Sequence, residues 1–274
     1  MKKHAIVTGG SAGIGLAVAR ELARQGFALT LLSSNPMRLE KARGLISQET
    51  SIEATTLAVD FANLDAVLAA SSSIATGWDV LVNNAGIKIQ TDAAVSVQGH
   101  ERHMAVNHLS HFVLTEGLLG AANDGARIVS VASFMARFAP QELFDSDSIS
   151  TSQRYAASKL ANLAFALELD ARLTAAGRPI RSVAAHPGFT RAEPYGTKVT
   201  RLGEYLLAQN TTWGAKPLVA AATAADPSAY TGPAIAELWG SPKTASINPL
   251  ALDPKWRSDF WSKSEELTGI EFRL

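Results

Sequence analysis

The sequence predicts an α/β fold, a doubly wound parallel sheet with helices on both faces. Short apolar runs alternate with longer stretches of helical periodicity from residue 4 onward, as in chains that wind helices around a parallel sheet. A chain of 274 residues, 47% of them hydrophobic, is also long enough to bury such a sheet in one domain. We expect a single domain over residues 1–274, with the sheet core in 1–188 and a substrate-side elaboration in 189–274.

The expected elements follow one another in strand–helix order. Apolar runs of strand length, expected as buried strands, are His4–Thr8, Phe27–Leu32, Ile52–Val59, Val80–Asn83, Arg127–Val131 and Ile180–Ala184. Helices are expected at Ile14–Gln25, after Pro36, and near residues 63–75, 97–121 and 153–175. In the first helix, Ile14, Val18 and Leu22 fall on one apolar face. Pro36 favours a helix start because it suits the first helical turn.

Composition excludes several classes of function. The formal net charge is zero, which leaves no electrostatic footprint for nucleic acid or an anionic membrane. The chain has no cysteine, so disulfides, thiolate metal sites and a cysteine nucleophile are excluded. The N-terminus lacks the pattern of a signal peptide, and no apolar run reaches the roughly 18 residues of a membrane span. We therefore expect a cytoplasmic protein that partners neither nucleic acid nor a membrane.

A glycine-rich turn joins the first strand to the first helix. It reads Thr8-Gly9-Gly10-Ser11-Ala12-Gly13-Ile14-Gly15. Glycine permits positive φ and a close approach of the backbone to a pyrophosphate, and the helix N-terminus then attracts the phosphates. No Lys-Ser/Thr pair follows the glycines, which excludes a nucleoside-triphosphate loop. A mere tight connection is the alternative, but the position between first strand and first helix predicts a dinucleotide site.

Tyr155 and Lys159 form a second feature that carries chemistry. Residues four apart share one helix face, and an ammonium beside a phenol stabilises the phenolate and lowers the pKa of the phenol. Alone, such a pair is a common surface arrangement. It becomes a catalytic hypothesis only when other motifs point to the same site.

The motifs together resemble the short-chain dehydrogenase/reductase family. The glycines follow its Gly9-x-x-x-Gly13-x-Gly15 pattern, and further matching stretches come in the family's order: Asn83-Asn84-Ala85-Gly86, Asn107, Ser133, Tyr155-Ala-Ala-Ser-Lys159 and His186-Pro187-Gly188. The resemblance covers most of residues 4–190. It is greatest to the branch of retinol dehydrogenases and protochlorophyllide reductases, on the runs Val106–Phe112 and Tyr155–Phe165. It implies a Rossmann-type fold, a nicotinamide cofactor and oxidoreductase activity.

The resemblance also implies roles for individual residues. Tyr155 would be the acid in carbonyl reduction and the base in alcohol oxidation, and Lys159 would lower its pKa and hold the nicotinamide ribose. Ser133 would hydrogen-bond the substrate oxygen, and Asn107 would support a water that links Lys159 to solvent. The residues expected to contact the cofactor are Gly9, Ser11, Gly13, Ile14, Gly15, Ser33, Ser34, Asn35, Arg38, Asp60, Phe61, Asn84, Ala85, Gly86, Tyr155, Lys159, Pro187, Gly188 and Thr190.

The end of the second strand favours NADP over NAD. An acidic residue there would bind the ribose 2′-OH and repel a 2′-phosphate, but the chain reads Ser33-Ser34-Asn35. These side chains could hydrogen-bond a phosphate, and Arg38 could neutralise it, although Arg38 could equally point into solvent. Asp60 and Phe61, at the end of the third strand, resemble the family's adenine contact. Asp60 could instead cap the next helix.

Two departures from the family pattern concern the substrate side. The segment between Ser133 and Tyr155 is longer than is common, which predicts an inserted loop over Arg137–Gln153 near the pocket mouth. The loop contains Asp145 and Asp147 and could alter subunit packing, so a homo-oligomer stays open. Ala192 stands where the family often has a threonine that contacts the nicotinamide, and Thr190 could replace it.

Histidines crowd the helix expected near residues 97–121: His100, His103, His108 and His111. Their spacing could suggest a metal site, but there is no cysteine and no matching acidic cluster, so we expect no metal. They are interpreted as helix-surface or interface residues. His186 is interpreted as the end of a strand beside the cofactor and not as an acid or base.

The sequence thus predicts an NADP-preferring oxidoreductase that interconverts a carbonyl and an alcohol. Aromatic residues on the substrate side suggest an apolar small-molecule substrate, unless they only fill the core: Phe134, Phe138, Phe189, Tyr195 and Trp213. Two alternatives stay open. One is a sensor or scaffold protein that binds NADP without turnover, and the other is a reductase of C=C bonds on the same frame.

Overall fold

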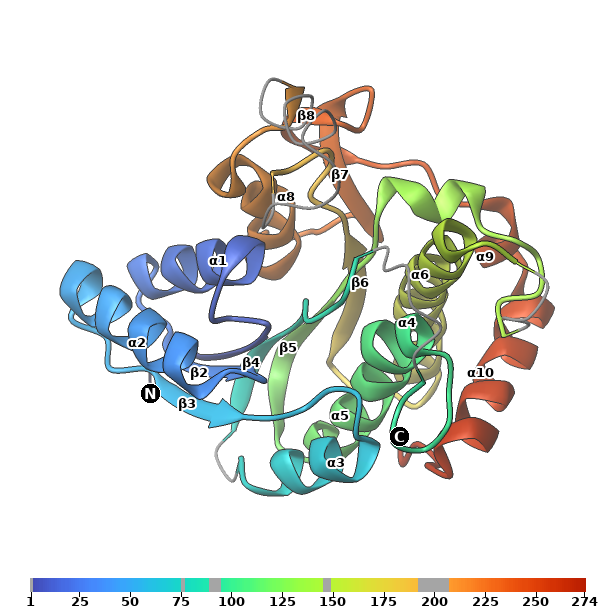
Figure 1. Cartoon of the computed structure of the whole chain (residues 1–274), viewed down its shortest axis with the longest axis horizontal. Coiled ribbons are helices and arrows are strands. Elements are labelled where there is room, and N and C mark those ends of the chain that lie inside the picture. Colours follow the sequence, from blue (N-terminus) through green and yellow to red (C-terminus); the bar gives the residue numbers. More distant parts are fainter. Residues whose placement is uncertain (1, 75–76, 89–94, 145–148, 192–206) are drawn as a thin grey trace.

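The computed structural model describes residues 2–74, 77–88, 95–144, 149–191 and 207–274 (Figure 1). Its strands form one sheet in the order β3-β2-β1-β4-β5-β6-β7-β8. Neighbouring strands are parallel except β8, which runs antiparallel to β7. The strand bounds are β1 (His4–Thr8), β2 (Ala28–Ser33), β3 (Thr55–Ala58), β4 (Trp78–Asn83), β5 (Ala122–Val131), β6 (Arg181–Ala185), β7 (Tyr230–Ile235) and β8 (Trp239–Thr244). The predicted α/β fold class is confirmed.

Helices cover both faces of the sheet. In Figure 1, α1, α2 and α8 lie on one side of the strands, and α3, α5 and α6 lie on the other, with α10 packed outside α6. The helix bounds are α1 (Gly13–Arg24), α2 (Pro36–Thr50), α3 (Leu64–Ser72), α4 (Arg102–Met104), α5 (Ser110–Leu119), α6 (Thr151–Ala175), α8 (Thr211–Thr223), α9 (Pro249–Leu252) and α10 (Pro254–Thr268). A π-helix, η1 (Ala105–Leu109), links α4 to α5, and a 3₁₀-helix, η2 (Phe134–Phe138), follows β5.

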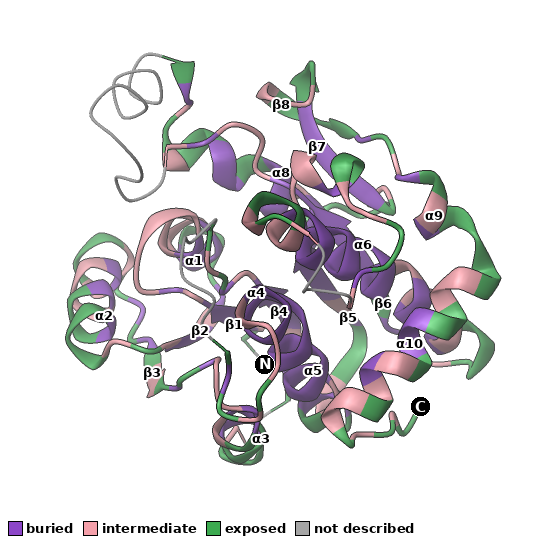
Figure 2. Ribbon diagram, turned by 45° about the vertical axis from the view of Figure 1, so that its right-hand side comes forward, coloured by how far each residue is buried: buried purple, intermediate pink, exposed green. Residues whose placement is uncertain are grey.

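Alternate side chains of each strand enter two separate apolar cores. In β1, Ile6 joins the core under α3, α5 and α6, whereas Ala5 and Val7 join the core under α1, α2 and α8. All three are fully buried. Because both faces need apolar residues, the parallel strands read as continuous hydrophobic runs. Figure 2 shows the result as buried strands enclosed by helices with exposed outer faces.

The structure adds two strands that the sequence interpretation did not include. β7 and β8 extend the sheet beyond β6 with residues that lie after position 188. Both contain glycine and proline, in Gly232-Pro233 and Gly240-Ser-Pro242, which weaken the strand signal in a sequence. Pro242 is tolerated because β8 is an edge strand, and Pro233 lies beyond the residues of β7 that pair with β6.

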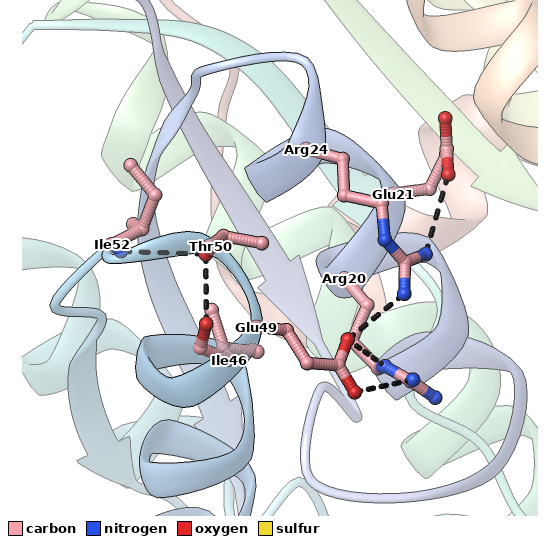
Figure 3. Close-up of polar contacts among 7 residues, drawn as sticks. All are labelled: Arg20, Glu21, Arg24, Ile46, Glu49, Thr50 and Ile52. Carbon is pink, nitrogen blue, oxygen red and sulfur yellow. Dashed lines mark hydrogen bonds and ion pairs between the residues drawn. The ribbon is translucent and has the colours of Figure 1, made fainter.

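Exposed ion pairs tie α1 to α2 on the outer face (Figure 3). The Glu49 carboxylate accepts hydrogen bonds from Arg20 Nε at 2.9 Å and from Arg24 Nη2 at 2.9 Å, and Glu21 lies 3.5 Å from Arg24 Nη1. Thr50, the last residue of α2, donates from its hydroxyl to the Ile46 carbonyl at 2.7 Å. Such solvated pairs contribute little stability each. They link the exposed faces of two helices that border the glycine-rich turn.

The helix predicted near residues 97–121 is interrupted. It consists of α4, the π-helix η1 and α5, and a π-helical turn shifts the faces that follow it. The interpretation of its histidines as surface or interface residues is wrong for His103, His108 and His111, which are at most 2% exposed. His108 is covered by α10, His111 lies beside Thr8 and Phe61, and His103 packs on Tyr155. Among the described residues, no group of three His, Cys, Asp or Glu side chains could hold a metal ion.

His108 connects this helix to the C-terminal helix α10. Its Nε2 lies 3.0 Å from Ser264 Oγ, and the Ser264 hydroxyl donates to the Phe260 carbonyl at 3.0 Å. His108 must therefore donate from Nε2. Aromatic rings of Phe112, Phe165 and Phe260 surround the imidazole.

None of the helices in the described part of the chain combines the length and apolar character that a membrane crossing needs.

We expect Ser264→Ala to destabilise the protein by about 1–3 kcal/mol, because it leaves the buried Nε2–H of His108 without an acceptor. Urea denaturation measures the free energy of unfolding. Ser262, exposed on the same helix, provides a matched control, and Ser262→Ala should stay within about 0.5 kcal/mol of the wild type. Equal effects of the two substitutions would contradict the assigned role of Ser264.

Stability should fall in mild acid. Burial lowers the pKa of His108 to about 3 and the pKa of His111 to about 4, from an ordinary value of 6.5. Between these values the unfolded chain binds more protons than the folded one, so the free energy of unfolding decreases as the pH falls below about 6.5. Each histidine contributes a slope of up to about 1.4 kcal/mol per pH unit. Unfolding measured from pH 7 to pH 4.5 should show a shallower slope for His108→Asn, and identical slopes would refute this.

Candidate active site

The polar residues singled out in the sequence gather at the edge of the sheet where the parallel strands end. Gly9 follows β1, Ser33 ends β2, Asn84 follows β4, Ser133 lies just after β5 and His186 follows β6. The chain runs outward through β1, β2 and β3 and then restarts beside β1 with β4. In open α/β sheets, ligands bind outside the carboxyl ends of the strands at such a point. The topology therefore brings the motifs to one site.

The N-terminus of α1 is open at this edge. Ala12 stands at its N-cap position and has no side chain that could cap the first turn, whereas Asn35 and Asn63 cap α2 and α3. Uncapped N–H groups and the helix dipole favour a bound anion. Gly15 allows the tight turn, because a Cβ there would lie 2.3 Å from the Gly9 carbonyl oxygen. The turn thus fits the pyrophosphate of a dinucleotide.

The predicted contacts Gly13 and Ile14 begin α1 in the same turn. Ser11 lies beside the end of β2, with its hydroxyl oxygen 2.7 Å from that of Ser33. Ser34 is exposed, and the Asn35 side chain accepts a hydrogen bond from the Arg38 N–H at 3.0 Å.

A cavity of about 300 Å³ lies between this turn and α2. Two basic residues line it together with the turn, and its lining is Ser11, Ala12, Gly13, Leu16, Arg38, Lys41, Ala42 and Leu45. Among these described residues there is no carboxylate, so the cavity suits a phosphate. The sequence interpretation missed Lys41. Its spacing of three from Arg38 on one helix was the available signal.

Asp60 and Phe61 follow β3 at the same edge. The exposed Asp60 carboxylate accepts a hydrogen bond from the Ala62 N–H at 2.9 Å. The residue that caps α3 is Asn63, so the alternative role of Asp60 as a helix cap is wrong. Phe61 is 5% exposed and packs on His111, with ring centroids 5.6 Å apart. The Phe61 ring is therefore part of the buried packing beneath this edge of the sheet.

Thr8 joins the two halves of the sheet at the point where the topology turns. Its hydroxyl oxygen accepts hydrogen bonds from the N–H groups of Asn84 and Ala85, both at 2.8 Å, and lies 2.9 Å from His111 Nε2. His111 Nδ1 lies 3.0 Å from the Asn107 carbonyl, which can only accept. The Thr8 hydroxyl therefore donates to Nε2. These bonds hold the segment after β4 beside the glycine-rich turn.

Asn107 lies in the π-helix and braces the same segment. Its Oδ1 accepts the Ile87 N–H at 2.8 Å, and its Nδ2 donates to Ser158 Oγ at 2.9 Å. The Ser158 hydroxyl in turn donates to the Tyr155 carbonyl at 2.8 Å. Gly86 lies so close that a Cβ there would be 2.9 Å from Asn107 Oδ1. Ser158, which the sequence interpretation left without a role, thus links Asn107 to the helix of Tyr155.

Ser133, Tyr155 and Lys159 meet where β5 ends and α6 begins. Ser133 Oγ accepts the Met135 N–H at 3.2 Å, and its side chain also hydrogen-bonds to Tyr155. Lys159 lies one turn further along α6, with Nζ 5.9 Å from the centroid of the Tyr155 ring. Lys159 Nζ donates to the Val131 carbonyl at 3.0 Å. The predicted trio is therefore together in space.

Asn162 shares the carbonyl that orients Lys159. Its Nδ2 donates to Val131 at 3.0 Å, and both side chains are at most 5% exposed. Asn162 lies three residues after Lys159 on α6, so the two side chains share a helix face. That spacing could have identified Asn162 from the sequence.

Burial decides the protonation states of the pair. It lowers the pKa of Lys159 to about 8, so the ammonium remains charged at neutral pH. Burial raises the pKa of Tyr155, and the hydrogen bond with Ser133 offsets this only in part. The pKa of Tyr155 is thus raised in this structure and not lowered as the spacing predicted, because the cost of desolvating the phenolate outweighs the interactions that favour it. Tyr155 is a protonated phenol at pH 7, the form that donates a proton.

The segment after β6 turns back on itself. Thr190 Oγ1 donates to the Pro187 carbonyl at 2.7 Å, and the Gln209 side chain donates to the same carbonyl at 2.7 Å. Gly188 between them has a φ of +69°. The Thr190 hydroxyl proton is thus engaged within the turn. Ala192 lies outside the described residues.

The inserted segment packs against α10. Leu143 is buried, and Phe144 stacks on Phe260 with ring centroids 5.8 Å apart. Asp145 and Asp147 lie outside the described residues.

The aromatic residues expected on the substrate side do not fill the core. Phe138 is 59% exposed and Trp213 is 43% exposed, while Phe134 and Phe189 are partly buried. Tyr195 lies outside the described residues. The core-filling alternative is wrong for the four described residues.

The sequence is similar to several characterised proteins. A family profile for short chain dehydrogenase matches residues 3–200. The chain is 32% identical to polyprenol dehydrogenase of Mus musculus, with 97% of this chain and 83% of that protein covered. It is 30% identical to retinol dehydrogenase 12 of Bos taurus, with 98% and 87% covered.

Solved structures agree with this assignment. A crystal structure of an uncharacterised protein from Mycobacterium paratuberculosis has a TM-score of 0.83 and 32% identity, covering 99% of this chain and 95% of that one. A short chain dehydrogenase from Burkholderia cenocepacia in complex with NADP has a TM-score of 0.64 and 28% identity, covering 80% and 89%. The chain belongs to the short-chain dehydrogenase family, as an NAD(P)-binding oxidoreductase that acts on CH–OH and C=O groups.

Proposed function

We propose that the protein is an NADP-preferring enzyme that interconverts a carbonyl compound and an alcohol on an apolar small molecule. The observation that carries the proposal is the meeting of Ser133, Tyr155 and Lys159 at the carboxyl edge of the sheet, with Lys159 fixed on the Val131 carbonyl. This edge also carries the uncapped N-terminus of α1. Cofactor and reacting groups would therefore share one crevice.

Each of the three side chains has a chemical task in this proposal. When bound, the nicotinamide supplies a hydride for reduction or accepts one in oxidation. Ser133 donates a hydrogen bond to the substrate oxygen, where negative charge develops. Tyr155, protonated at neutral pH, gives its proton to that oxygen as the alcohol forms. The charged Lys159 stabilises the phenolate that Tyr155 leaves.

The preference for NADP rests on the charges beside the glycine-rich turn. The cavity there is lined by Arg38 and Lys41, and β2 ends at Ser33 in place of a carboxylate. Two cations would attract a 2′-phosphate, and no acidic side chain in that lining would repel it. The solved relative from Burkholderia cenocepacia is in complex with NADP.

The proposal of an apolar substrate rests on Phe134 and Phe138. Both belong to η2, directly after Ser133, and their rings lie 5.6 Å apart. Relatives whose names specify polyprenol and retinol as substrates support a long apolar alcohol or aldehyde. Ring faces beside the reacting group would shelter such a chain from water.

Turnover tests the proposal. With NADPH and a panel of apolar aldehydes, all-trans-retinaldehyde among them, we expect oxidation of NADPH and formation of the alcohol. Tyr155→Phe should reduce kcat at least about a hundredfold, since it removes the proton donor, while NADPH still binds. Binding without turnover of any carbonyl compound would support a sensor or scaffold protein instead, and a product saturated at C=C would support the other alternative.

Cofactor choice has its own test. Fluorescence titration should show tighter binding of NADPH than of NADH. Arg38→Ala should weaken NADPH binding by about tenfold and leave NADH nearly unchanged, because a charged hydrogen bond to phosphate is worth about 1.5–3 kcal/mol. Arg43→Ala, on the same helix but outside the cavity lining, is the control and should change neither affinity. Equal affinities of the wild type for the two cofactors would refute the preference.

A further inference from the structure

The turn that carries Ser133 is held from outside by the hairpin β7–β8. The Tyr230 hydroxyl, on the first residue of β7, donates to the Ser133 carbonyl at 3.3 Å. Tyr230 is 3% exposed, and burial raises the pKa of Tyr230, so the hydroxyl keeps the proton that it donates. The same Ser133 carbonyl accepts the Ala136 N–H at 3.0 Å within η2.

Two further contacts reach η2 from the same part of the chain. The Glu237 carboxylate, at the tip of the hairpin, forms an ion pair with Arg137 and accepts the Ser246 N–H at 2.9 Å. Asn248, just before α9, donates from Nδ2 to the Ala136 carbonyl at 2.9 Å in a buried hydrogen bond. Residues 230–248 therefore contact η2 and the residue before it at three positions: Ser133, Ala136 and Arg137.

His186, the residue after β6, packs against two of the residues that make these contacts. Its ring packs on Tyr230 with centroids 5.2 Å apart, and its Nε2 lies 3.4 Å from Glu237 Oε2. Its Nδ1 accepts the Gly188 N–H at 3.3 Å, so the proton of the neutral ring is on Nε2, toward Glu237. Gly232 makes room for the ring, because a Cβ there would lie 2.0 Å from His186 Nε2.

A short 3₁₀-helix needs such support. Its hydrogen bonds are poorly aligned and it spans only Phe134–Phe138, so its own contacts hold Ser133 weakly. A misplacement of about 1 Å at a reacting group can cost about a hundredfold in rate. Contacts that fix the Ser133 carbonyl therefore also fix the hydroxyl on the same residue.

We propose that Tyr230, Glu237 and Asn248 are positioning residues that hold the η2 turn and thereby set the location of the Ser133 hydroxyl. The inference rests on the proposed function for the role of Ser133. None of the three residues needs to touch the substrate. His186 acts behind them, by packing on Tyr230 and facing Glu237.

Turnover in two backgrounds tests the role. With a carbonyl substrate identified in the aldehyde panel, Tyr230→Phe and Glu237→Gln should each lower kcat by about tenfold and change KM less than about twofold. In a Ser133→Ala background the same substitutions should change the residual kcat less than about twofold, because the group that they position is gone. Equal losses in both backgrounds would refute the proposal, since a general structural defect does not depend on Ser133.

Charge and location provide controls. Arg137→Lys, which keeps the cation facing Glu237, should retain more kcat than Arg137→Gln. Asp259→Asn breaks the exposed ion pair with Lys255 on α10, away from η2, and should leave kcat unchanged. A similar loss in Arg137→Lys and Arg137→Gln would contradict a role for the ion pair.

Amide hydrogen exchange tests whether these contacts stabilise η2, and it does not depend on turnover. The N–H of Met135 donates to Ser133 Oγ and that of Ala136 to the Ser133 carbonyl, so both amides report on η2. Their exchange should become at least about threefold faster in Tyr230→Phe and Glu237→Gln than in the wild type or Asp259→Asn. Unchanged exchange would overturn the inference. A wild type without turnover but with this exchange pattern would refute only the proposed function.

Discussion

Burial of the sheet on both faces is the constraint on which the site depends. Most side chains in the middle of the strands are apolar because helices cover each face, and the polar side chains of the motifs lie where the strands end. Parallel strands all end at one edge, and the motifs after β1, β4, β5 and β6 therefore meet there. A single packing requirement thus determines both the stability of the domain and the place of its chemistry.

The same constraint sets the proton chemistry. Lys159 is buried and keeps its charge at neutral pH only because its pKa, although lowered, stays at about 8. Its ammonium finds an acceptor in the Val131 carbonyl, a backbone group that the end of β5 leaves available. Tyr155 is driven toward its neutral form by burial. A buried cation beside a protonated phenol is an arrangement suited to stabilising the phenolate once the proton has moved.

The C-terminal elements contact the segments that carry the site residues. α10 covers the helix of Asn107 through His108 and Ser264, and it receives the inserted segment through the stacked rings of Phe144 and Phe260. β7 and β8 approach the Ser133 turn from the other side. Both α10 and the β7–β8 hairpin contact segments that carry site residues.

The sequence by itself indicated the α/β fold, the glycine-rich turn and the Tyr155–Lys159 pair, because each leaves a local mark: a run of apolar residues, a cluster of glycines, or a four-residue spacing on a helix. Ser133 leaves no such mark and was expected only from the resemblance to the family. Only the tertiary structure decided the rest. The strands β7 and β8 carry prolines, which weaken the strand signal. The histidines are buried by partners distant in the sequence: α10 for His108, Thr8 and Phe61 for His111, and Tyr155 for His103. The raised pKa of Tyr155 likewise depends on desolvation by the whole fold and not on its neighbour four residues away. Contacts such as that of Asn248 with Ala136 join positions 112 residues apart, and a sequence pattern holds no signal for them.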